Sequence, residues 1–126
     1  MAKILIVDDE YTIAETLSEI LAYEGFEPSA ASNGELGLAA LEKSRPDIVL
    51  VDYMMPVMDG VKMLRAMRAE PRWAGIAAIM MTAAPARALA EHAALWNAFL
   101  RKPFEADQMV KLVREVLAKK ALGSGL

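Results

Sequence analysis

The chain has 126 residues, of which 56% are hydrophobic and 25% charged, and this size and composition are typical of one folded domain. It contains no cysteine and one histidine, which excludes a disulfide framework, a cysteine nucleophile and a multi-histidine metal site. Its net charge of -3 has the wrong sign for a dedicated nucleic-acid binder, so no direct contact with nucleic acid is expected. Carboxylates, hydroxyls and amines remain to carry any chemistry.

No stretch of the sequence indicates a membrane or secretion segment. The first apolar run covers residues 4–7, stops at Asp8 and is too short for the core of a signal peptide. Nowhere do about 18 apolar residues run together, which is the length that crosses a bilayer as a helix. We therefore expect a cytoplasmic domain with no membrane partner.

Short apolar or β-branched runs alternate with longer stretches of helical periodicity. This alternation is typical of a parallel sheet covered by helices on both faces. One of the runs, Glu27-Pro28-Ser29, is polar and contains a proline, which has no backbone donor, so it predicts an edge strand. The predicted strands cover residues 3–7, 27–31, 47–51, 76–81 and 98–100.

The stretches between the strands predict five helices. Asn33 and Asp59 are suitable N-caps for the second and third helices, and Pro85 suits the first turn of an alanine-rich fourth helix over residues 86–94. We expect one domain over residues 1–122 and a short flexible tail over residues 123–126. The first and last helices have apolar stripes formed by Ile13, Leu17, Ile20 and Leu21, and by Met109, Leu112, Val113, Val116 and Leu117.

Acidic residues follow two of the apolar strands. Asp8 and Asp9 come after the first strand, and Asp52 comes after the third. An isolated Asp8-Asp9 pair would most simply cap the first helix. However, the ligand crevice of an open parallel sheet forms at the carboxyl ends of its strands, so the three acids are expected to converge there. Either some of them are then protonated or a cation lies among them, and oxygen ligands favour magnesium.

Two further polar residues follow apolar runs at equivalent places. Thr82 comes after the fourth strand and Lys102 after the fifth. A hydroxyl and an ammonium group beside magnesium are suitable donors to the oxygens of a phosphoryl group in transfer. The nucleophile that remains is an aspartate, which would become an acyl phosphate, and spacing alone does not say which aspartate it is.

These residues together resemble the receiver domain of response regulators. The resemblance is carried by Asp8-Asp9, by Asp52 in the run Asp52-Tyr53-Met54-Met55-Pro56-Val57-Met58-Asp59-Gly60, by Thr82-Ala83 and by Lys102-Pro103-Phe104, and it extends over residues 4–117. It implies an α/β, flavodoxin-like fold, in which a doubly wound parallel sheet of five strands in the order 2-1-3-4-5 carries five helices.

The resemblance also implies the roles of the acids. Asp52 would accept a phosphoryl group from a phosphohistidine on a sensor histidine kinase or a histidine phosphotransfer protein. Asp9, Asp52 and the backbone carbonyl of Met54 would bind Mg²⁺, while Asp8 would act mostly through a bound water. The domain would assist its own phosphorylation and dephosphorylation as a signalling module, and it is not expected to be an enzyme.

The resemblance further implies a conformational switch. Lys102 would pair with the phosphoryl oxygens, Thr82 would swing to hydrogen-bond them, and Phe99 would turn inward behind Thr82. The Lys102-Pro103 bond is expected to be cis. The surface of the fourth helix, fifth strand and fifth helix would then signal to an unknown downstream protein. A receiver can stay monomeric or form a homodimer through this surface on phosphorylation, and the sequence does not decide between the two.

Two other classes of protein would share these features. An aspartate-based phosphohydrolase would also need magnesium, a lysine and a hydroxyl, but such enzymes carry a second aspartate two residues after the nucleophile, where this chain has Met54. A pseudo-receiver would bind partners without phosphorylation, and it would more often have lost one of the four residues Asp8, Asp9, Asp52 and Lys102. The sequence is compatible with a complete regulator and with a part of a longer protein.

Overall fold

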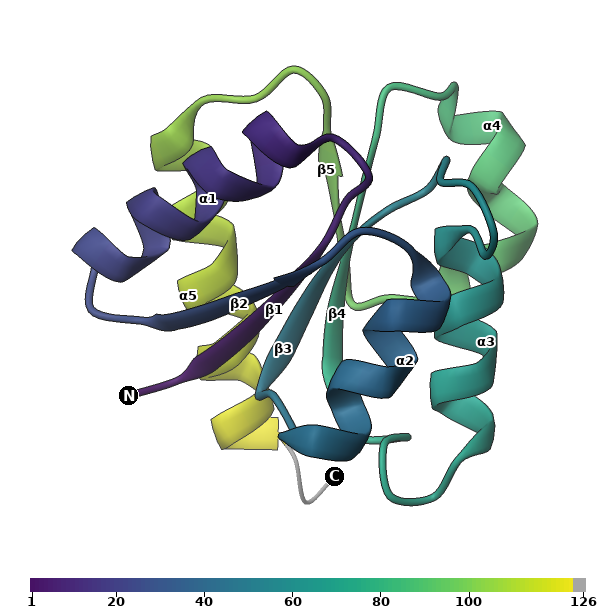
Figure 1. The fold of residues 1–126 in the computed structure, drawn as a ribbon, viewed down its shortest axis with the longest axis horizontal. Helices are drawn as coiled ribbons and strands as arrows, with labels where there is room; N and C mark the ends of the chain where they lie inside the picture. The colour runs from purple at the N-terminus through teal and green to yellow at the C-terminus, as the bar shows by residue number, and fades with distance from the viewer. Residues whose placement is uncertain (124–126) are drawn as a thin grey trace.

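The computed structural model describes residues 1–123 as a five-stranded parallel sheet with helices on both faces (Figure 1). The strand order is β2-β1-β3-β4-β5, so the predicted flavodoxin-like α/β fold is confirmed. The strand β2 lies at one edge of the sheet, as its proline indicates. The strands are β1 (Lys3–Val7), β2 (Glu27–Ala31), β3 (Ile48–Asp52), β4 (Ala77–Thr82) and β5 (Ala98–Arg101).

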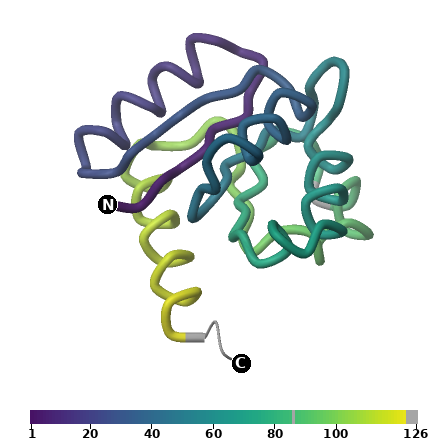
Figure 2. Tube along the Cα trace, turned by 60° about the horizontal axis from the view of Figure 1, so that its bottom comes forward, coloured from purple at the N-terminus to yellow at the C-terminus, as the bar shows by residue number. Residues whose placement is uncertain are grey.

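The helices lie in two layers. Figures 1 and 2 show α1 and α5 on one side of the sheet and α2, α3 and α4 on the other. Each layer has its own apolar core, because alternate strand residues point to opposite faces: Ile4 and Ile6 belong to one core, Leu5 and Val7 to the other. The helices are α1 (Tyr11–Tyr23), α2 (Gly34–Lys43), α3 (Gly60–Ala69), α4 (Ala86–Leu89), the 3-10 helix η1 (Ala90–Leu95) and α5 (Ala106–Gly123).

Local signals fix the starts of two helices. The Asn33 side chain accepts a hydrogen bond from the backbone N–H of Leu36 at 2.8 Å, and the Asp59 side chain accepts one from Lys62 at 2.9 Å. Both residues are the N-caps that the sequence predicts, because a short polar side chain satisfies a donor that the first helical turn leaves free.

The predicted fourth helix over residues 86–94 is only partly correct. The chain forms one short α-helix, α4, and then continues as the 3-10 helix η1. Leu89 is buried, whereas no residue of η1 is. A stretch of alanines has helix propensity but little apolar surface to dock, so packing does not enforce one long α-helix here.

Small differences at the strand ends affect the site. The structure starts β3 and β4 one residue later than predicted and includes Asp52 and Thr82 as their last residues. Gly123 is the last residue of α5, and residues 124–126 of the predicted tail lie outside the described part of the chain. Within the part that the structure describes, no helix is long and apolar enough to span a membrane.

Candidate phosphoacceptor and metal site

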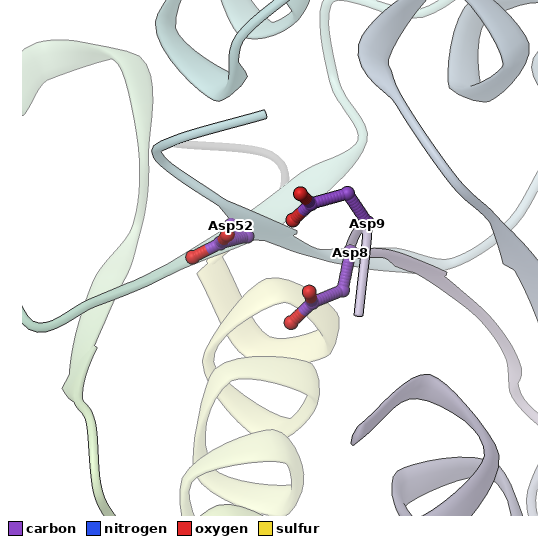
Figure 3. A group of neighbouring side chains, drawn as sticks. All are labelled: Asp8, Asp9 and Asp52. Atoms are coloured by element: carbon purple, nitrogen blue, oxygen red, sulfur yellow. The ribbon is translucent and has the colours of Figure 1, made fainter. Parts of the chain in front are cut away.

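Three carboxylates meet at the carboxyl end of the sheet, as the sequence predicts. Asp8 and Asp9 follow β1, and Asp52 ends the neighbouring strand β3, in which Val51 is the partner of Val7. Each acid offers one carboxylate oxygen, and these oxygens all lie within 4.8 Å of one another (Figure 3). Asp8 and Asp52 are buried, whereas Asp9 is exposed. The cluster therefore has one open side, through Asp9.

Lys102 neutralises part of this negative charge. Its Nζ donates a hydrogen bond to Asp8 Oδ2 at 2.9 Å and lies 3.3 Å from Asp52 Oδ1. Lys102 follows β5, and the Lys102–Pro103 peptide bond is cis as expected. Burial lowers the pKa of Lys102, but its hydrogen bond to Asp8 and its attraction to Asp52 more than offset this and raise the pKa overall. The charged side chain of Lys102 thus lies between the carboxylates of Asp8 and Asp52 and contacts both.

The surroundings of Asp52 disfavour the ionised form of its carboxyl group. Burial raises its pKa from the ordinary 3.8 to about 6, with Lys102 acting in the opposite direction and Asp8 adding to the rise. A carboxylate in this position gains from any further cation. Three oxygen donors of this kind suit a hard divalent ion such as Mg²⁺, so the acidic pocket could bind a metal.

The raised pKa of Asp52 leads to a prediction about the stability of the protein. Replacing Asp52 by asparagine should stabilise the metal-free protein at pH 7 by on the order of 2 kcal/mol. Because folding raises the pKa of this carboxyl from 3.8 to about 6, the folded chain binds the proton more tightly, and the free energy of unfolding falls as the pH rises through that window. Asparagine cannot ionise, so the gain should disappear below about pH 4. Urea unfolding at both pH values measures it.

The matched control for this prediction is Asp9→Asn. It removes one carboxylate from the same cluster, but at an exposed position, and a much smaller change in the free energy of unfolding is expected. An Asp52→Asn protein that is no more stable than the wild type at neutral pH would show that the ionised Asp52 carboxylate does not destabilise the fold.

The loop after Asp52 packs against the strand end through a glycine. The backbone N–H of Gly60 donates to the carbonyl oxygen of Tyr53 at 3.0 Å. A Cβ at position 60 would collide with the backbone carbonyl oxygen of Asp52 and would lie 3.2 Å from the Cα of Tyr53. This close approach explains why the run that starts at Asp52 ends in glycine.

The other predicted residues are placed differently. Thr82 is buried at the end of β4, one residue beyond Met81, the strand partner of Asp52. Its Oγ1 accepts a hydrogen bond from the backbone N–H of Ala84 at 3.0 Å. Phe99 lies half-buried on β5, and Met54 is 66% exposed. The structure thus gathers the three acids and Lys102, while Thr82 lies at the end of β4, Phe99 on β5 and Met54 after the end of β3.

Sequence reasoning missed one residue beside this site. Arg101 precedes Lys102, and its guanidinium donates to the carbonyl oxygens of Ala83 and Ala84 at 3.4 and 3.1 Å. Successive side chains of a strand point to opposite faces, so if Lys102 points toward the site, its neighbour Arg101 points away from it. This alternation is the signal that the sequence offers for Arg101. That pattern predicts exposure but not these contacts.

The comparisons identify the class of this fold and site. The family model for the response regulator receiver domain matches residues 4–114, and the chain belongs to this family. The receiver domain is a signalling domain of two-component systems, in which response regulators interact with kinases and downstream effectors.

Three relatives illustrate the similarity. Regulatory protein AtoC of Escherichia coli is 38% identical over 91% of this chain and 25% of its own length. DNA-binding response regulator MtrA of Mycobacterium tuberculosis is 34% identical over 93% of this chain and 51% of its own length. The structure of chemotaxis protein CheY4 of Vibrio cholerae has a TM-score of 0.87 and 30% identity, covering 92% of this chain and 98% of that one. The chain thus spans about a quarter of the length of AtoC and about half of the length of MtrA.

Proposed function

We propose that this domain accepts a phosphoryl group on Asp52 from a phosphohistidine donor in a magnesium-dependent reaction. The observation that carries the proposal is the buried Asp52 carboxylate, held among Asp8 and Asp9 and 3.3 Å from the Lys102 ammonium. In this step an Asp52 oxygen attacks phosphorus and an O–P bond forms. The N–P bond of the donor breaks, and the imidazole leaves with the electron pair and takes up a proton.

Each group at the site has a part in this proposal. Asp9, Asp52 and the backbone carbonyl of Met54 would hold Mg²⁺, and Asp8 would act mostly through a bound water. The ion supplies positive charge to the phosphoryl oxygens when bound. Lys102 already lies beside Asp52 and would donate to the same oxygens. Through these groups the domain would assist its own phosphorylation and dephosphorylation.

The same proposal includes a change of conformation. The Thr82 hydroxyl would move to the phosphoryl group, Phe99 would turn inward, and the face formed by α4, β5 and α5 would signal to a downstream protein or to a second copy of the chain. The upstream partner would be a sensor histidine kinase or a histidine phosphotransfer protein. The proposed domain comprises residues 1–122. Its proposed location is the cytoplasm.

The output of the whole protein is a separate question. MtrA, whose name describes it as DNA-binding, is about twice as long as the matched segment. The net charge of this chain argues against nucleic-acid contact only for the 126 residues themselves. A longer protein that contains this domain could therefore bind DNA through another part.

An intact-mass measurement tests the proposed reaction. After incubation with acetyl phosphate or phosphoramidate and Mg²⁺, the chain should gain the mass of one phosphoryl group, and it should gain none without the metal. Asp52→Asn should abolish the gain, whereas the matched control Asp107→Asn, which alters an exposed aspartate of α5, should retain it. No gain in a folded protein that binds Mg²⁺ would favour the pseudo-receiver class instead.

A further inference from the structure

One exposed arginine connects the last strand to the loop that follows Thr82. Arg101 is the strand partner of Thr82 in the pairing of β4 with β5. Its guanidinium donates to the carbonyl oxygens of Ala83 and Ala84 at 3.4 and 3.1 Å. The same guanidinium lies over the ring of Phe99, with 5.4 Å between the Cζ atom and the ring centroid. A single side chain therefore contacts both a loop and an aromatic ring near the site.

The loop contact extends to the hydroxyl of Thr82. The backbone N–H of Ala84, whose carbonyl Arg101 holds, donates to Thr82 Oγ1 at 3.0 Å. The peptide groups at Ala83 and Ala84 thus lie between the guanidinium on one side and the buried hydroxyl on the other. A displacement of the Thr82 side chain that carries this loop with it must lengthen the hydrogen bonds of Arg101.

The Phe99 ring borders a hollow in the surface of the domain. A hollow of about 160 Å³ lies beside the ring, under the alanine-rich segment of α4 and η1. An apolar cavity of about 150 Å³ is large enough to hold benzene, so the hollow is of the right size for a phenyl ring. Its lining consists of Leu89, Ala90, Ala93, Trp96 and Phe99.

We propose that Arg101 is a positioning residue that latches the loop after Thr82 and the Phe99 ring in the arrangement seen here. The latch opposes movement of both groups, so it sets how readily the domain changes conformation. Its link to phosphorylation rests on the proposed function, whereas its effect on the loop and the ring does not. Arg101 contacts no acid of the cluster in the described structure, and its role is conformational.

The first test uses the unphosphorylated protein. Arg101→Ala should raise the hydrogen-exchange rate of the Ala84 amide about threefold to tenfold, since the lost interactions are a pair of exposed hydrogen bonds and an exposed cation–π contact. In a Trp73→Phe background, the fluorescence of Trp96, which lines the same hollow as Phe99, should also change. Unchanged exchange and fluorescence would overturn the proposal. The matched control, Arg45→Ala, removes an arginine that donates to the Arg72 carbonyl, and neither signal should move.

The second test measures the rate of phosphorylation by acetyl phosphate with Mg²⁺. Arg101→Ala should accelerate the gain of mass about threefold to tenfold over the wild type. Arg101→Lys, which keeps the charge and a donor but not the planar guanidinium over Phe99, should fall between the two. An equal or slower rate in Arg101→Ala would overturn the link to the switch. If the wild type gains no phosphoryl group, the proposed function is wrong. The hydrogen-exchange experiment then tests by itself whether Arg101 holds the loop and the Phe99 ring in place.

Discussion

Replacing Lys102 by methionine should slow the gain of a phosphoryl group from acetyl phosphate about a hundredfold, because a donor to the developing charge is lost. The same variant should bind Mg²⁺ more tightly. In the wild type the Lys102 ammonium lies 2.9 Å from Asp8 and 3.3 Å from Asp52, so a divalent cation must enter beside a positive charge. Intact mass against time and titration calorimetry with Mg²⁺ measure the two effects.

Opposite changes in the two measurements separate this role from a loss of structure. A poorly folded variant would lose metal affinity and phosphorylation together. The matched control Lys111→Met changes an exposed lysine of α5 and should alter neither quantity. Phosphorylation at the wild-type rate in Lys102→Met would contradict the role proposed for the lysine.

Replacing Gly60 by alanine should lower the free energy of unfolding by about 3 kcal/mol, at the upper end of the usual cost of overpacking. The added Cβ would collide with the backbone carbonyl oxygen of Asp52, and backbone atoms at the end of a buried strand cannot move aside as a flexible side chain does. Because the collision is at Asp52 itself, any folded variant should also bind Mg²⁺ weakly. Urea unfolding measures the first effect.

The matched control for this substitution is Gly75→Ala. At that position the nearest neighbour of an added Cβ is the Arg45 side chain at 3.9 Å, an ordinary contact. The expected change in the free energy of unfolding is within about 1 kcal/mol. Equal stabilities of the Gly60→Ala and Gly75→Ala proteins would show that the close approach at Asp52 is not tight.

Much of the fold follows from patterns within single segments. The apolar run before Asp52 predicts a strand buried on both faces, and Pro28 predicts an edge, and both predictions are confirmed. The convergence of Asp8 and Asp52 also follows, once the first and third strands are neighbours. That strand order came partly from the resemblance to receiver domains.

Other features depend on packing that a sequence pattern does not contain. The segment after Pro85 has the composition of one α-helix. In the structure, however, the α-helix ends at the buried Leu89, and the chain continues as a 3-10 helix. The contacts of Arg101 with Phe99 and with the loop at Ala84 arise from side-chain directions across two strands. Periodicity assigns Arg101 to the surface and says nothing about its partners.

The residue that carries the phosphoryl group can be located within the chain by chemical reduction. The protein would be treated with acetyl phosphate and Mg²⁺ and then reduced with borohydride, which converts the acyl phosphate of an aspartate to an alcohol, and its peptides would be sequenced by mass spectrometry. We predict homoserine at position 52 and unchanged aspartate at positions 8 and 9. Homoserine at another position, or none in a protein that has gained a phosphoryl group, would contradict the assignment of Asp52 as the acceptor.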